Sequence, residues 1–298
     1  MTSVQNISSW RKAGVIAAES LDYAKKLVVK NASLLEVSEK IEEFITSKGA
    51  VPAFPVQLSC DNIAAHYCAY PGDETIFQEQ VVCVDVGVCV DGCIGDTACT
   101  IDLSGKYSEL VSASRQALNS AIKLCTPGTE IGIIGRAVQE IITAKGFSPI
   151  RNLSGHGLDK YTIHSEPQIP NVDTKDSTKL LEGMIIAVEP FASTGTGIVK
   201  ESGASSVFSL NNVKPVRSRE ASQVLQLITK EWNSLPFCTR WITKKFGIGT
   251  TARALRELMT AGIITAHPPL FDTGIVSQAE HTIIVEEKPI ILTKSTNE

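Results

Sequence analysis

Residues 81–102, with the sequence VVCVDVGVCVDGCIGDTACTID, limit the folds open to this chain more than any other segment. Two runs rich in strand-forming residues flank Asp91-Gly92, and Asp-Gly is a strong signal for a two-residue β-hairpin turn. Both runs are apolar, so both faces of the hairpin need cover. A chain of 298 residues with 43% hydrophobic and 20% charged residues can form a core large enough to provide that cover.

The register of this hairpin brings two aspartates together. We take Val90 to face Cys93 across the turn. Gly87 then lies opposite Asp96, and Asp85 lies on the same face two residues before Gly87. Asp85 and Asp96 become diagonal neighbours whose carboxylates can converge. Either this face is exposed and the aspartates are hydrated, or they are buried and need cations or donors, because two buried carboxylates repel each other.

Other residues that bind metals lie in apolar or turn-rich segments. Glu189 lies within IIAVEPF and Glu280 opens EHTIIV, and both segments are apolar enough to form buried strands. Two of the five histidines, His156 and His164, lie in SGHGLDKYTIHSEPQIPN. Oxygen-rich sets with one imidazole suit divalent Mn, Fe, Co or Zn. Four carboxylates and one histidine match a two-metal site, and the candidate set is Asp85, Asp96, Glu189, Glu280 and His156.

The periodicity of apolar residues predicts two repeated units. The predicted helices cover residues 9–30, 34–48, 106–125 and 129–145. Two helices followed by a hairpin therefore occur twice, near residues 9–102 and 106–210, which favours two similar halves that face each other across a cleft.

The rest of the chain predicts fewer elements. GMIIAVEPFAS indicates one buried strand, residues from about 217 to 262 are helical, and EHTIIVEEKPIILT indicates a final hairpin. We expect an α+β fold with a single catalytic domain over residues 1–298, which contains a helical insertion at about 211–265.

Composition excludes several classes of protein. The net charge of −4 and the lack of a basic run argue against direct binding of nucleic acid or a membrane surface. No apolar stretch approaches the ~20 residues of a membrane span. The start, MTSVQNISSWRKAG, lacks the apolar core of a signal peptide, so we expect a cytoplasmic protein. The eight cysteines form no C-x-x-C pair, which favours a packing role over a zinc or disulfide framework.

Five segments together resemble a known family. NIAAHY, VDVGVCVDGCIGDTA, SGHGLDKYTIH, GMIIAVEPF and QAEHTIIV are similar, in order, to the site motifs of methionine aminopeptidases. The separation between Glu189 and Glu280 resembles the helical insertion of the type II subfamily, and the short N-terminus resembles the archaeal form. The resemblance implies the pita-bread fold, in which two pseudo-symmetric halves surround a dinuclear metal site.

The same resemblance implies the role of each site residue. It implies that two divalent ions (Co, Mn, Fe or Zn) are bound, with Asp96 and Glu280 as bridging ligands. Asp85 completes one ion's ligands, and His156 with Glu189 completes the other's. Glu189 also moves the proton between nucleophile and leaving amine. His66 and His164 contact the substrate around the scissile peptide bond. The methionine side-chain pocket is implied at Phe54 and Ile163, with Leu270 as a further wall.

The implied reaction is hydrolysis of the first peptide bond of nascent polypeptides that begin with methionine, when the second residue is small. A metal-bridged hydroxide would be the nucleophile. The family suggests a monomer, and a nascent-chain substrate allows transient association with the ribosome. Two positions depart from the type II pattern and affect the shape of the pocket: His267 stands where tyrosine is frequent, and Ala279 where phenylalanine is common.

Two other functions fit part of the pattern. Xaa-Pro dipeptidases and aminopeptidases share the fold and the five ligands, although they usually carry a separate N-terminal domain. A non-catalytic relative that binds ribosomes or RNA is a different class of protein. That function predicts lost ligands and basic extensions, whereas this chain has all five ligand residues and a net charge of −4.

Overall fold

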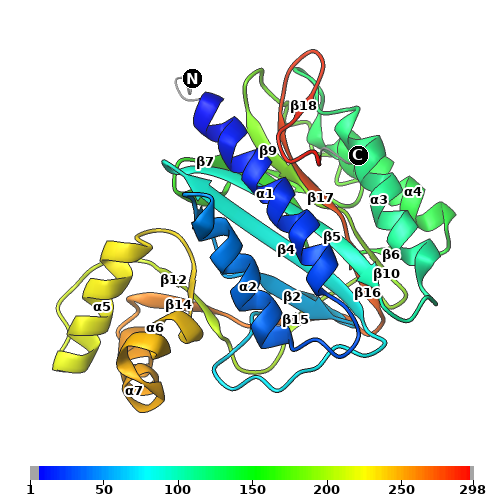
Figure 1. Ribbon diagram of the computed structural model, residues 1–298. Coiled ribbons are helices and arrows are strands. Elements are labelled where there is room, and N and C mark those ends of the chain that lie inside the picture. The colour runs from blue at the N-terminus through cyan, green and yellow to red at the C-terminus, as the bar shows by residue number, and fades with distance from the viewer. Residues whose placement is uncertain (1–6, 296–298) are drawn as a thin grey trace.

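The computed structural model describes residues 7–295 and has one large curved sheet at its centre (Figure 1). Along the sheet the strands follow the order β1-β4-β5-β17-β9-β7-β8, with β2 paired to β4 and β18 paired to β17. The strands are β1 (Val51–Pro52), β2 (Gln57–Cys60), β4 (Val81–Val90), β5 (Cys93–Asp102), β7 (Ser154–Asp159), β8 (Thr162–Pro170), β9 (Ile185–Val188), β17 (Glu280–Ile284) and β18 (Ile290–Ile291).

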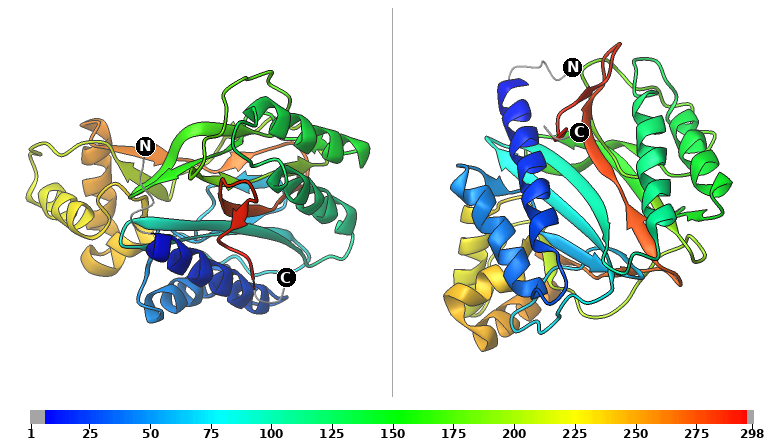
Figure 2. Two further views of the ribbon diagram at one scale, coloured as in Figure 1. Left: turned by 90° about the horizontal axis from the view of Figure 1, so that it is seen from above. Right: turned by 45° about the vertical axis from the view of Figure 1, so that its right-hand side comes forward.

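Two helix pairs cover this sheet, one pair for each half of the fold. Helices α1 (Ile7–Leu27) and α2 (Leu34–Ser47) pack over the β4–β5 hairpin. Helices α3 (Ser108–Ile122) and α4 (Ile131–Ala144) pack over β8, β9 and β17. Figure 2 (right) shows the two pairs on the same side of the sheet, with β17 between them. The doubled arrangement of helices and strands predicted from the sequence is confirmed.

The β4–β5 hairpin has the predicted turn and register. Asp91 and Gly92 have φ angles of 52° and 87°, and positive φ at both turn positions is what a type I′ turn requires. Val90 pairs with Cys93, and Gly87 pairs with Asp96. Gly87 also leaves room for Phe54, because a Cβ atom there would lie 2.2 Å from the Phe54 ring.

The segment predicted as one buried strand at GMIIAVEPFAS is two strands, so that prediction was wrong in its extent. Strand β9 ends at Val188, and β10 (Phe191–Ser193) joins a separate sheet with β6 (Ser148–Pro149) and β16 (Val276–Gln278). The break falls at Glu189-Pro190, where proline lacks the N–H needed to continue a ladder. Glu189 is therefore at the junction of two sheets.

The region predicted to be helical between 217 and 262 contains three helices. They are α5 (Arg219–Glu231), α6 (Thr239–Phe246) and α7 (Ile248–Thr260), at the lower left of Figure 1. The short strand β13 (Phe237–Cys238) interrupts them and forms a sheet with β12 (Val207–Leu210) and β14 (Ile264–His267). These elements share a hydrophobic cluster of their own. Their assignment as an insertion within one catalytic domain stays a prediction.

The remaining strands form a small sheet near the cavity described below. Its order is β11 (Lys200–Glu201), β15 (Leu270–Phe271) and β3 (Ile63–Ala65). All eight cysteines lie within the described residues and are free, and seven of them are buried. Within residues 7–295, no helix is both long and apolar enough to cross a membrane.

A buried ion pair connects the three-helix region to the main body. Arg240 in α6 donates to both carboxylate oxygens of Glu42 in α2, at 2.7 Å each. Glu42 also accepts from the Trp241 indole at 2.9 Å and from the Val56 backbone N–H at 3.3 Å. Because Glu42 and Arg240 are both buried, each charge depends on the other for neutralisation.

We predict that Arg240→Met destabilises the protein by ~3–5 kcal/mol, because it leaves the Glu42 carboxylate buried without a counter-charge. Lys244→Met is the matched control: Lys244 lies in the same helix and pairs with Glu39 at the surface, at 2.9 Å. An exposed pair of this kind contributes ~0–1 kcal/mol. Denaturant unfolding measures both changes, and equal small losses would contradict the role given to the buried pair.

Candidate metal centre

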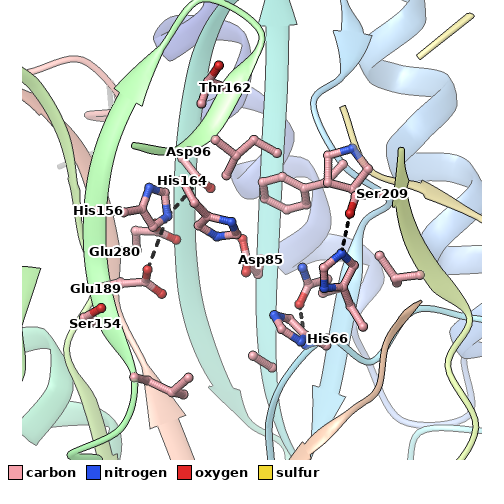
Figure 3. Close-up of a pocket in the computed structure, with 18 of the residues that line it drawn as sticks. His66, Asp85, Asp96, Ser154, His156, Thr162, His164, Glu189, Ser209 and Glu280 are labelled. Carbon is pink, nitrogen blue, oxygen red and sulfur yellow. Dashed lines mark hydrogen bonds and ion pairs between the residues drawn. The ribbon is translucent and has the colours of Figure 1, made fainter. Parts of the chain in front are cut away.

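A cavity of about 320 Å³ opens between the two halves and the three-helix region (Figure 3). All five candidate ligand residues line it. Asp85 lies in β4, Asp96 in β5, Glu280 in β17, Glu189 directly after β9, and His156 in β7. These five strands are consecutive neighbours in the sheet. Because adjacent strands lie ~5 Å apart, one residue from each strand suffices to gather five donor groups on one face.

Cross-strand contacts fix the centre of this group. Glu280 pairs with Ala98, and its carbonyl accepts from the Thr97 hydroxyl at 2.9 Å. The Asp96 backbone N–H donates to the Thr282 hydroxyl at 2.7 Å, and that hydroxyl donates to the Asp96 carbonyl at 2.8 Å. These hydrogen bonds join β5 to β17 next to Asp96 and Glu280, and so fix the two carboxylates relative to each other.

The donor atoms are spaced for a cation. One ligand atom each from Asp96, His156 and Glu280 lies within 4.8 Å of the others. His156 Nε2 is 3.9 Å from Asp96 Oδ2 and 3.4 Å from Glu189 Oε1, as the dashed lines in Figure 3 show. Asp85 Oδ1, Asp96 Oδ1 and Glu280 Oε2 are buried and have no hydrogen-bond partner among the described residues. Buried carboxylate oxygens of this kind fit divalent metal binding.

The electrostatics of the cavity indicate the same need for a cation. Burial raises the pKa of Asp85 from 3.8 to about 7. The pKa values of Asp96, Glu189 and Glu280 are raised well above their ordinary range by burial first and then by repulsion from the neighbouring carboxylates. In the metal-free protein these groups therefore hold protons at pH values where exposed carboxylates are ionised.

His156 is held in the form that binds a metal. Its Nδ1 donates to the carbonyl of Gly157 at 3.2 Å, which leaves the lone pair of Nε2 directed at the carboxylates. Burial, with a smaller contribution from His164, lowers the pKa of His156 from 6.5 to about 3. The ring is thus a neutral imidazole through the whole physiological range.

The residues predicted to contact the substrate lie around the same centre. The rings of His156 and His164 are 4.5 Å apart, and those of His66 and His267 are 5.9 Å apart. His66, His164, His267, Phe54 and Ile163 all line the cavity, and the first two can be followed in Figure 3.

Two residues that the sequence analysis linked to the pocket, Leu270 and Ala279, do not line the cavity. Leu270 nevertheless packs with Phe191 and pairs with Ala65, which both line the cavity, so its place in the pocket stays a prediction. Ala279 packs in the core beneath α3 and α4.

His281 is buried on the opposite face of β17 from Glu280, as consecutive residues of a strand are. Its Nδ1 lies 2.9 Å from the hydroxyl of Thr293.

Sequence reasoning missed two amides beside the candidate ligands. Gln278 Nε2 donates to Glu189 Oε2 at 3.3 Å, and Gln57 lines the cavity next to Asp85. Gln278 could have been found from its position two residues before Glu280 in an extended segment, because alternate residues share a face. Gln57 offered no local signal, since β2 meets β4 only in the tertiary structure.

Comparisons with known proteins identify the family. The profile of metallopeptidase family M24 matches residues 8–221. The methionine aminopeptidase of Pyrococcus abyssi is 43% identical over 286 residues, which covers 95% of this chain and 97% of that protein. The chain therefore belongs to metallopeptidase family M24, and within it to the methionine aminopeptidases.

Solved structures support the fold. The methionine aminopeptidase of Thermotoga maritima superposes with a TM-score of 0.72 at 24% identity, covering 99% of this chain and 98% of that one. A thermophilic Arx1 superposes with a TM-score of 0.86 at 16% identity, covering 98% and 91%. The architecture is the pita-bread fold, and the protein is a metal-dependent hydrolase.

We predict that divalent metal stabilises the protein more at about pH 8 than at about pH 5, because metal binding must displace protons from the carboxylates. The sign follows from the raised pKa values. A carboxyl group with a raised pKa contributes its full stabilisation to the metal-free protein below its pKa in the unfolded chain, which is 3.8 for Asp85. This contribution is lost as the pH rises through the folded pKa of Asp85, about 7. Thermal unfolding of chelator-treated protein with and without Mn²⁺ measures the increment. An increment that is equal or larger at the lower pH would contradict the assigned centre.

Proposed function

We propose that this protein is a methionyl aminopeptidase that removes the N-terminal methionine of nascent polypeptides whose second residue is small. The observation that carries this proposal is the convergence of four carboxylates and a neutral imidazole beside an apolar wall with two further histidines. The sequence identity to archaeal methionine aminopeptidases over almost the whole chain supports the same activity. Transient association with the ribosome, a monomeric state and a cytoplasmic location stay predictions.

The ligand set supports two divalent ions. In this proposal Asp85, Asp96 and Glu280 would hold one ion, and Asp96, Glu280, Glu189 and His156 would hold the other. The unpartnered oxygens of Asp85, Asp96 and Glu280 support cation binding at these three carboxylates. When bound, the ions would supply a water activated at neutral pH and positive charge for the substrate carbonyl.

Glu189 fits the role of proton carrier. Its carboxylate is at the junction between β9 and β10, where Gln278 donates to Oε2 and the imidazole of His156 faces Oε1. In the metal-free protein, burial and then the neighbouring aspartates raise the pKa of Glu189, whereas a bound cation would favour the ionised form that accepts a proton. A carboxylate oxygen that can hold a proton here can accept one from the attacking water and return it to the leaving amine.

His164 and His66 face the cavity from opposite sides and fit contacts to the peptide (Figure 3). Phe54 and Ile163 are buried apolar side chains of the same cavity. They belong to one hydrophobic cluster, together with Ile94 and Leu158. An apolar slot of this kind fits the unbranched side chain of methionine.

We predict that peptides with methionine first and a small second residue are cleaved fastest. In competition among Met-Ala-Ser, Met-Leu-Ser, Leu-Ala-Ser and Leu-Pro-Ser, release of the free N-terminal amino acid should favour Met-Ala-Ser. A mismatch in an apolar slot lowers kcat/KM roughly 10–200-fold. Preferential cleavage of Leu-Pro-Ser would instead identify an Xaa-Pro peptidase, and no cleavage of any peptide by metal-loaded protein would favour a binding protein.

We predict different results for the two neighbouring histidines. His156→Ala removes a ligand and should lower both metal content and turnover. His164→Ala should keep its metal and lower kcat/KM about 10–100-fold, because it removes a contact to the substrate. Metal analysis paired with steady-state kinetics distinguishes the variants. Loss of metal in His164→Ala and not in His156→Ala would reverse the assignment.

A further inference from the structure

His66 has an uncommon backbone conformation for a residue that faces a substrate cavity. Its φ angle is 67°, in the left-handed region that non-glycine residues rarely occupy. Ala65 and His66 both line the cavity, although they are consecutive. In a continuous strand, neighbouring side chains point to opposite faces. The left-handed turn at His66 is what allows the imidazole to face the same cavity as Ala65.

A single side chain supports this turn from the neighbouring strand. The backbone N–H of His66 donates to Gln57 Oε1 at 2.6 Å, which is the dashed line at His66 in Figure 3. The turn begins where β3 ends, and the last residue of that strand, Ala65, pairs with Leu270. The Gln57 amide oxygen thus takes the place of a strand partner for a backbone donor that has left the sheet.

Gln57 is itself held firmly. It is 9% exposed and pairs with Asp85 in the β2–β4 ladder. The next residue, Leu58, donates its backbone N–H to the carbonyl of Tyr67 at 3.0 Å. Two bonds therefore connect β2 to the turn, one from the Leu58 backbone and one through the Gln57 side chain, and β2 also pairs with the strand that carries Asp85.

We propose that Gln57 is a positioning residue, which holds His66 in its left-handed conformation and so fixes the imidazole relative to Asp85. The inference rests on the proposed function, in which His66 contacts the peptide. Gln57 acts through the backbone of His66 and requires no contact of its own with the substrate. A shift of His66 would leave the ligand residues in place and disturb only the placement of the scissile bond.

Kinetics in a double-mutant cycle test this inference. Gln57→Met keeps similar length and volume but lacks the acceptor oxygen. We expect it to lower kcat/KM about 5–100-fold with unchanged metal content, as for loss of one hydrogen bond to a half-buried donor. In the His66→Ala background the same substitution should change kcat/KM less than about twofold. Equal losses in both backgrounds would show that Gln57 does not act through His66.

Ser59 provides the matched control in the same strand. It is 2% exposed, and its hydroxyl has no hydrogen-bond partner among the described residues. Ser59→Ala therefore perturbs β2 without touching the turn, and it should leave kcat/KM within about twofold of wild type. A loss comparable to that of Gln57→Met would mean that any change in β2 has this effect, and it would overturn the inference.

Amide hydrogen exchange tests the bond without relying on activity. The His66 amide should exchange at least about tenfold faster in Gln57→Met than in wild type, because its acceptor is gone. Gln57→Glu retains an acceptor oxygen at the same reach and should retain protection. Unchanged exchange in Gln57→Met would overturn the inference. Failure of the wild-type protein to release methionine would instead overturn the proposed function, and the exchange measurement would still decide the role of Gln57.

Discussion

Four buried carboxylates repel one another at the centre of this molecule, and the geometry of the site follows from how the sheet holds them together. Asp85, Asp96, Glu189 and Glu280 line one cavity, where they are buried and repel one another. Without compensation such a group is costly to ionise, and the raised pKa values express that cost. The protein can tolerate the cluster because its sheet is held together elsewhere, by the paired cores under α1–α2 and α3–α4. Bound positive charge would relieve this repulsion, and a divalent metal ion supplies such charge.

The strand order of the large sheet brings the five donor groups together. Consecutive strands β4, β5, β17, β9 and β7 each contribute one donor, so no long loop has to reach across the molecule. Strand β17 is decisive, because it joins the two halves by pairing with β5 on one side and with β9 on the other. Glu280 is the first residue of that strand. Its position between Asp96 and Glu189 follows directly from the way the two halves join.

The residues proposed to contact the substrate are positioned differently from the proposed metal ligands. Four of the candidate ligands lie in strands of the large sheet and Glu189 directly follows one, although the register between β7 and β8 shifts next to His156. His66 leaves the regular sheet in a left-handed turn, and His267 ends β14 with its Nε2 2.8 Å from the hydroxyl of Ser209. Contacts to a polypeptide must come from several directions. These residues reach the cavity from turns and from the three-helix region, and they depend on side-chain hydrogen bonds such as that of Gln57.

The sequence alone determined the hairpin, its register and the pairing of helices with strands. These features depend on local chemistry: Asp91-Gly92 fits a type I′ turn, and alternation of residues along each strand places Asp85 and Asp96 on one face. Family resemblance then pointed to the residues that line the cavity, apart from Leu270. The break at Glu189-Pro190 has a local signal in the proline. Three features were decided only in the tertiary structure: the separate sheet that β10 joins, the packing of Leu270 with the Phe191 and Val276 cluster, and the bond from His66 to Gln57. Each of these depends on which distant strands become neighbours, and residue order along one segment carries no information about that choice.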